Sequence, residues 1–131
     1  DFVDPIYGNE KFQTLADAQI MILPSFTENF GMTVAEALSV GTPVITTNQT
    51  PWHQLDSKNA GWCIDIGVEA TINCLEEALS KNVDELNEMG TRGIEWMQQD
   101  FSWPTIINKL ILTYGWLNDK KKKKCEWIKI D

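Results

Sequence analysis

Two carboxylates with a glycine between them form the segment of this sequence that is best suited to bind a ligand. Glu28 and Glu36 are separated by seven residues, and Gly31 lies within that interval. A carboxylate accepts hydrogen bonds only, so it pairs well with the two hydroxyls of a vicinal diol. Gly31 has no Cβ, so the backbone there can approach a ligand closely. The segment therefore predicts a site that takes up hydroxyl groups at two places.

The elements around this segment must position it. Apolar runs of strand length occupy 19–23 and 43–47, and residues 33–39 predict a helix that Gly41 stops. Each run is typical of a strand buried on both faces. In an open parallel sheet, ligands bind beyond the carboxyl ends of the strands, where the loops that follow the strands lie. The N-terminus of the following helix favours an anion. Hydroxyls at two places with phosphate between them indicate a sugar nucleotide.

The rest of the chain repeats the alternation of strands and helices. Alternation of this kind predicts an α/β, three-layer Rossmann-like domain with a parallel sheet covered on both faces. Ser102 is expected to cap the last helix, with Pro104 in its first turn. The further elements expected are a strand end at 2–3, a strand at 61–64, and helices over 11–18, 68–79, 83–99 (bent at Gly90) and up to about 117.

The same stretch resembles the signature of glycosyltransferase family 4. Glu-x7-Glu carries Phe-Gly after the first carboxylate and Ala after the second, and Gly-Thr-Pro-Val-Ile follows at 41–45. The sequence on either side of the motif agrees, and the resemblance covers about residues 10–117. These flanking residues are similar to those of family members that build bacterial surface polysaccharides. The flanking matches are Leu-Pro-Ser at 23–25, Pro51-Trp52, Gly61-Trp62 and Phe101-Ser102-Trp103.

The resemblance implies one half of a GT-B fold, the C-terminal donor-binding domain. It implies transfer of a glycosyl group from a nucleoside-diphosphate sugar to a saccharide or lipid-linked acceptor, with retention and without a metal or cofactor. Residues 1–117 would be the nucleotide-sugar-binding domain and 118–131 a Lys-rich tail. The acceptor domain and the basic diphosphate contacts are expected upstream of Asp1, so this chain is expected to be an inactive piece of a hexosyltransferase.

The resemblance also implies roles for single residues. Glu28, as the catalytic position, would contact the transferred sugar near its anomeric carbon, and Glu36 would hold the ribose diol. Thr33 stands where Pro is common in the family, and either residue can begin a helix. The donor-binding set implied is Glu28, Asn29, Phe30, Gly31, Met32, Thr33 and Glu36, with the amides of 30–32 on sugar and diphosphate.

Each candidate has a structural alternative. Thr33-x-x-Glu36 also fits a capping box, in which Glu36 satisfies a helix N-terminus. Glu28 could be a solvated loop carboxylate. Trp52 and Trp62 could stack on a nucleobase, although packing is favoured. The single histidine, His53, is favoured as a surface helix start over a general base.

Composition excludes several classes of function. The chain carries 11 basic and 19 acidic residues, a net charge of −8, so it does not attract a nucleic-acid backbone. Cys63, Cys74 and Cys125 are odd in number and lack metal-ligand spacing; Cys63 and Cys74 are expected as buried apolar groups. We therefore expect these cysteines to be free thiols in a reducing cytoplasm. The sequence shows no secretory signal. It also has no run of 18 or more apolar residues, so it predicts no membrane-spanning helix.

Alternatives stay open for the tail and for the function. The run Lys120–Lys124 either contacts an anionic leaflet peripherally or forms a solubilising terminus. A non-catalytic nucleotide-sugar-binding module and a GT-B-type sugar-nucleotide epimerase are the alternative functions. A dinucleotide-dependent oxidoreductase is disfavoured because Gly-x-Gly-x-x-Gly does not occur.

Overall fold

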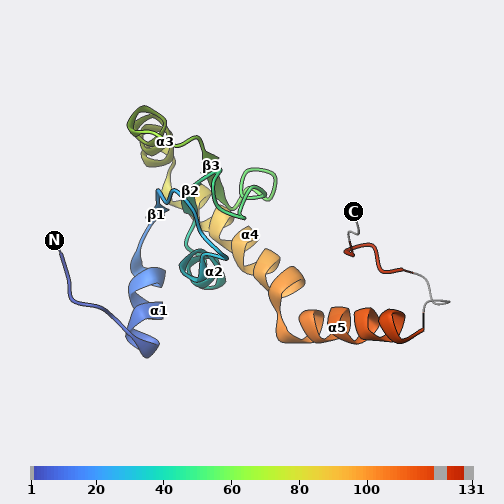
Figure 1. The fold of residues 1–131 in the computed structure, drawn as a ribbon. Coiled ribbons are helices and arrows are strands. Elements are labelled where there is room, and N and C mark those ends of the chain that lie inside the picture. Colours follow the sequence, from blue (N-terminus) through green and yellow to red (C-terminus); the bar gives the residue numbers. More distant parts are fainter. Residues whose placement is uncertain (1, 120–123, 129–131) are drawn as a thin grey trace. The chain divides into compact units, whose positions relative to one another are not determined.

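A computed structural model describes residues 2–119 and 124–128 (Figure 1). By their contacts the residues divide into two compact units, Asp1–Met97 and Gln98–Asp131. The elements, in chain order, are α1 (Gly8–Asp17), β1 (Met21–Leu23), α2 (Met32–Ser39), β2 (Val44–Thr47), β3 (Gly61–Ile64), α3 (Val68–Ser80), α4 (Val83–Phe101) and α5 (Trp103–Asn118).

The sheet of the first unit has three parallel strands in the order β1-β2-β3. Met21 of β1 aligns with Val44 of β2, which aligns with Gly61 of β3. All four residues of β2 are buried, as expected for the central strand of a covered sheet. The predicted α/β class with a parallel sheet is therefore confirmed.

Helices cover both faces of the sheet, so the unit has three layers (Figure 1). Side chains alternate between the faces along β2: Val44 packs in the cluster that includes Leu38 of α2, and Ile45 packs in the cluster that includes Ala78 of α3. Helix α4 contributes to both clusters, through Met89 on the α3 face and Trp96 on the α2 face. It therefore ties the two layers of helix together.

The prediction of a strand end at 2–3 was wrong: these residues form no strand and are exposed, since nothing pairs with them among the described residues. Helix α4 runs continuously through Gly90, and this glycine serves a contact between backbones. A Cβ built on Gly90 would lie 2.0 Å from the carbonyl oxygen of Gly41, so α4 packs backbone to backbone on the turn after α2.

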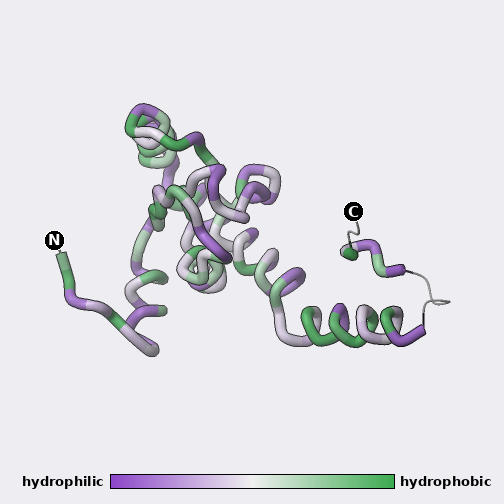
Figure 2. Tube along the Cα trace, in the orientation of Figure 1, coloured by the Kyte–Doolittle hydropathy of each residue, from purple (hydrophilic) through white to green (hydrophobic). Residues whose placement is uncertain are grey.

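The second unit contains the end of α4 and the whole of α5, which is hydrophobic along much of its length (Figure 2). Ser102 occupies the predicted N-cap position, but its side chain makes no capping bond to the backbone. Its hydroxyl lies 3.1 Å from that of Thr105. No helix among the described residues is long and apolar enough to cross a membrane. Most of the predicted Lys run, 120–123, lies outside the described residues.

Replacing Gly90 by alanine tests the backbone contact. Helix propensity alone would make alanine stabilising by about 1 kcal/mol. We expect Gly90→Ala to destabilise by at least about 2 kcal/mol, because a methyl group cannot share the space of the Gly41 carbonyl. Urea unfolding measures the difference, with Glu95→Ala on the exposed face of α4 as the control. A gain in stability would show that the two backbones are farther apart.

Candidate functional site

Threonine side chains of β2 fix the loop that follows β1. The Thr46 hydroxyl donates to the carbonyl of Leu23 at 2.9 Å, and the Thr47 hydroxyl donates to the carbonyl of Ser25. Ser25 in turn donates through its hydroxyl to the carbonyl of Thr27 at 2.9 Å. Both threonines are buried, so water competes little for these bonds. The loop carrying Glu28 is thereby held at the carboxyl edge of the sheet.

A buried tryptophan holds the end of the same loop. Trp52 is 2% exposed, and its indole Nε1 donates to the carbonyl of Phe30 at 2.6 Å. Its ring lies 5.2 Å from the ring of Phe30 and 5.5 Å, edge-on, from that of Trp96. Gly31 has φ 76°, and a Cβ there would come 3.0 Å from the indole nitrogen. Both the backbone conformation and the indole therefore favour glycine at 31.

The favoured interpretation of the two tryptophans as packing residues agrees with their contacts. Trp62 is 7% exposed, and its indole Nε1 donates to a carboxylate oxygen of Glu77 at 2.9 Å. The Glu77 carboxylate therefore has a hydrogen-bond partner in the core, the indole of Trp62. His53 is exposed in a turn and does not begin a helix.

Helix α2 begins one residue before Thr33, and this rules out the capping box. Gly31 is the N-cap, no side chain caps the helix, and Thr33 lies within the first turn. The amides of Val34 and Ala35 donate to the carbonyl of Gly31 at 2.9 and 3.4 Å. The amides of Met32 and Thr33 precede these and have no acceptor within the helix. They give the start of α2 the donors that an anion requires.

Glu36 is engaged by a lysine that sequence reasoning missed. The ammonium of Lys11, in α1, lies 2.6 Å from Oε1 of Glu36, and the two side chains are 34% and 18% exposed. One signal could have pointed to it: Lys11 is the single Lys or Arg among the first 57 residues. The ion pair joins α1 to α2 across 25 positions of sequence, which no local pattern reveals.

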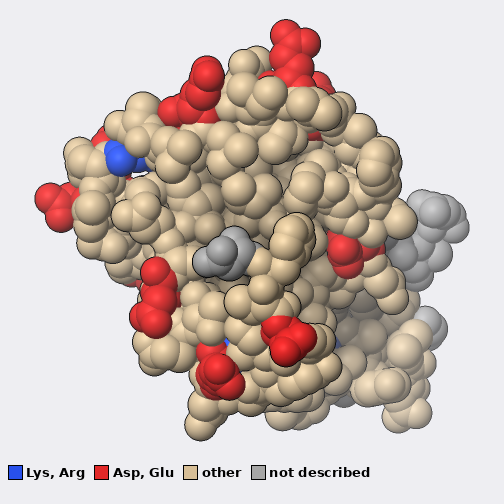
Figure 3. Space-filling model, turned by 90° about the vertical axis from the view of Figure 1, so that its left-hand side faces the viewer, with Lys and Arg blue, Asp and Glu red and all other residues tan. Residues whose placement is uncertain are grey.

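The predicted donor residues lie on one continuous stretch, from the loop after β1 to the second turn of α2. Glu28 and Glu36 are half-buried, and Gly31 is buried. The side chains of Asn29, Phe30, Met32 and Thr33 are exposed. The surface in Figure 3 carries scattered Asp and Glu side chains and very little Lys or Arg. Positive potential for an anion must therefore come mainly from backbone dipoles.

An apolar cavity of about 350 Å³ opens at the same edge of the sheet. Its walls include Pro24 after β1, Thr47 at the end of β2, and Ile66 after β3. Phe26, which lies two positions before Glu28, also lines it and is 77% exposed. The carboxyl edge thus combines polar groups at the start of α2 with an apolar recess beside the loop.

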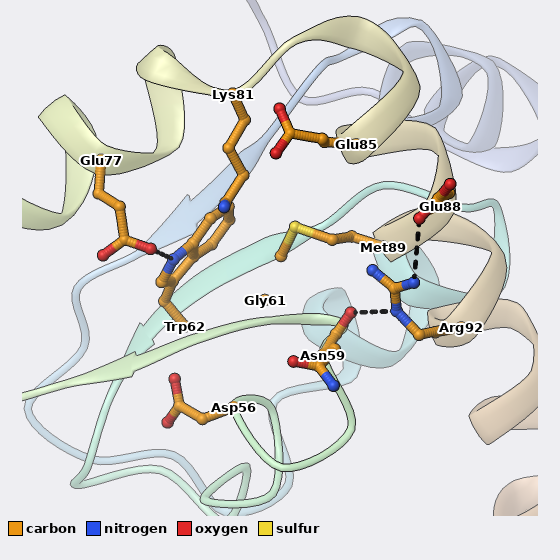
Figure 4. Close-up of a pocket in the computed structure, with 10 residues that line it drawn as sticks. All are labelled: Asp56, Asn59, Gly61, Trp62, Glu77, Lys81, Glu85, Glu88, Met89 and Arg92. Carbon is orange, nitrogen blue, oxygen red and sulfur yellow. Dashed lines mark hydrogen bonds and ion pairs between the residues drawn. The ribbon is translucent and has the colours of Figure 1, made fainter.

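A second hollow, of about 370 Å³, lies at the amino end of β3 (Figure 4). Several of its charged side chains have partners within the fold: Arg92 Nε donates to the carbonyl of Asn59 at 2.9 Å and Nη1 lies 3.6 Å from Glu88. The Asp56 carboxylate accepts from the amide of Cys63 at 3.3 Å. These groups serve the fold, and the hollow lies away from the Glu28–Glu36 segment.

The thiols of the first unit are unsuited to nucleophilic or metal chemistry. Burial, with nearby carboxylates, raises the pKa of Cys63 and raises that of Cys74 to about 11. A thiol with a raised pKa is little ionised near neutral pH. The described residues contain no group of three or more metal-binding side chains.

The Trp52 indole provides a test of how the loop is held. Trp52→Phe keeps an aromatic ring but removes the donor to the Phe30 carbonyl. We expect a loss of about 1–2 kcal/mol in the free energy of unfolding, because the carbonyl loses a buried partner. Trp103→Phe is the matched control, since Trp103 is 78% exposed and should change stability by less than about 0.5 kcal/mol. Equal effects of both substitutions would contradict this role.

The raised pKa of Cys74 predicts a pH dependence of stability. Between pH 9 and 11 the thiol loses its proton in the unfolded chain but keeps it in the folded one. The unfolded state then binds fewer protons, so stability falls as pH rises through this window. Denaturant titrations of wild type and Cys74→Ala should show a shallower alkaline fall in the variant. Parallel pH profiles would show that Cys74 titrates alike in both states.

Comparison with known proteins covers most of the chain. It is 25% identical over 103 residues to MMP alpha-(1->4)-mannosyltransferase of Mycolicibacterium hassiacum, covering 76% of this chain and 25% of that protein. It is 32% identical over 96 residues to trehalose synthase of Rubrobacter xylanophilus, covering 73% of this chain and 22% of that protein. The chain thus spans about a quarter of the length of these curated relatives.

Structure comparison agrees. Sucrose-phosphate synthase from Thermosynechococcus elongatus superimposes with a TM-score of 0.70 at 24% sequence identity, over 82% of this chain and 27% of that one. That likeness concerns the fold. Residues 2–96 match the family Glycosyl transferases group 1, a range that contains all three strands and the Glu28–Glu36 segment. The chain therefore belongs to the group 1 glycosyl transferases.

Proposed function

We propose that this chain is the nucleoside-diphosphate-sugar-binding domain of a retaining hexosyltransferase of family 4. One observation carries the proposal: the start of α2 presents the amides of Met32 and Thr33 between Glu28 and Glu36 at the carboxyl edge of the sheet. An anion with hydroxyl-bearing groups on either side is the ligand that such a set suits. Membership of the glycosyl transferases supports this choice of ligand.

The roles follow from the chemistry of each group. Glu36 accepts hydrogen bonds from the ribose diol, and Glu28 accepts them from the transferred sugar near its anomeric carbon. The amides of Phe30, Gly31 and Met32 bind the sugar and the diphosphate. Asn29 and Thr33 complete the donor-binding set, and no metal or cofactor takes part. The departing diphosphate is stabilised by backbone dipoles already aimed at it, and Glu28 is not assigned as a covalent nucleophile.

The whole enzyme would use this domain as one half of a GT-B fold. A second domain would bind the saccharide or lipid-linked acceptor, and it is consistent with this that the chain spans about a quarter of its relatives' length. Basic residues outside this chain would add to the diphosphate site. We further propose that the enzyme acts in bacterial-type polysaccharide synthesis on the cytoplasmic side.

Nucleotide binding by this chain tests the proposal. Ligand-observed NMR with ADP, GDP, UDP and their glucose or mannose conjugates should detect one nucleotide series. Glu36→Ala should weaken its binding about tenfold or more, because the ribose loses a charged acceptor. Glu76→Ala, an exposed carboxylate on α3, is the matched control and should bind like wild type. Absence of binding by every nucleotide, or equal binding by Glu36→Ala, would contradict the proposed site.

A further inference from the structure

An ion pair joins the first turn of α1 to the second turn of α2, within the donor segment. Lys11 is the fourth residue of α1, and Glu36 is the fifth residue of α2. Lys11 Nζ lies 2.6 Å from Glu36 Oε1, within charge-assisted hydrogen-bond distance. Glu36 is only 18% exposed, so its partner is not easily replaced by water. The contact therefore restricts where the Glu36 carboxylate can point.

The position of the pair follows from how the helices meet the sheet. The end of α1 lies at the amino end of β2, where the Thr42 hydroxyl donates to the carbonyl of Leu15 at 2.6 Å. The start of α1 extends away from that end, and α1 contacts α2. Helix α2 starts where the loop from the carboxyl end of β1 arrives. Lys11 thus contacts α2 at Glu36, one turn after the amides of Met32 and Thr33.

We propose that Lys11 is a positioning residue of the donor site, which sets its preference for a ribose over a deoxyribose nucleotide. The inference rests on the proposed ribose contact of Glu36. The ammonium holds Oε1 and leaves Oε2 directed to a ribose hydroxyl. It also offsets the charge of Glu36 where a diphosphate must approach.

The charge distribution makes Lys11 the residue for this task. It is the single basic side chain in the first 57 residues, which include both motif carboxylates. The next two along the chain are placed elsewhere: Lys58 lies over the ring of Trp96, and Lys81 lines the hollow at the amino end of β3. Without Lys11, Glu36 would keep its full charge beside the bound anion and could rotate toward water.

Paired nucleotides test the role of Lys11. ADP, GDP and UDP are titrated by NMR beside their 2′-deoxy counterparts, and the ratio of the two dissociation constants is the readout. Lys11→Met should weaken the ribonucleotide about tenfold and lower the ribose preference, whereas Lys11→Arg should restore it. Lys81→Met removes the same charge far from the segment and should leave the ratio unchanged. A purely structural effect would weaken both sugars alike.

A second variant keeps the proposal testable if Lys11→Met does not fold. Glu36→Gln removes the ion pair without altering Lys11 and should lower the ribose preference, and adding Lys11→Met or Lys11→Arg to it should change the ratio no further. A Lys11→Met protein that binds with the wild-type ratio would overturn the inference while leaving the proposed function intact. Wild type that binds none of the six nucleotides would instead remove the proposed function, and the inference with it.

Discussion

The hydrogen bond from the Trp52 indole to the carbonyl of Phe30 is the constraint on which the candidate site depends. Trp52 comes from the segment between β2 and β3, yet its ring contacts both the loop after β1 and Trp96 of α4. The bond can form because Gly31 leaves the space that a Cβ would fill. It holds the residue just before the N-cap Gly31, and the first turn of α2 carries the amides of Met32 and Thr33. A site that relies on fixed dipoles needs such support, since dipoles stabilise charge only when they are already aimed at it.

A chain of net charge −8 that binds an anionic nucleotide has to obtain positive potential without many cations. Backbone amides provide it without any net charge, and their effect is strongest within the first turn of a helix. In the proposed complex, the Lys11–Glu36 pair would let an acceptor for hydroxyls stand one turn farther along α2 without leaving its whole charge exposed to the phosphates. The acidic composition and the proposed ligand are therefore compatible, provided that the geometry of this one edge is kept.

Much of the fold could be predicted because the signals are local. The apolar runs at 19–23 and 43–47 predict β1 and β2, and the Glu-x7-Glu motif with its flanks resembles a glycosyltransferase signature, in agreement with the family to which the chain belongs. Tertiary contacts could not be read in this way. The pattern Thr33-x-x-Glu36 suggested a capping box that α2 does not use, whereas Asn82 and Glu85 form one at α4 through reciprocal bonds of 2.8 and 3.0 Å. The sequence likewise does not show why residue 90 is glycine, because the Gly41 carbonyl comes to lie against it only in the folded chain.

Position in the sheet, not the size of a hollow, favours the candidate site over the other hollow. The hollows at the two edges have similar volumes, about 370 and 350 Å³, and the one at the amino edge holds more charged side chains. Several of those side chains already have partners, as Arg92 has in Glu88 and in the carbonyl of Asn59, so a ligand there would have to compete with existing contacts. At the carboxyl edge the start of α2 has amides without helical acceptors, because every helix leaves its first donors unpaired. A parallel sheet brings the helix N-termini that follow its strands to this edge, and it is here that binding can add hydrogen bonds instead of exchanging them.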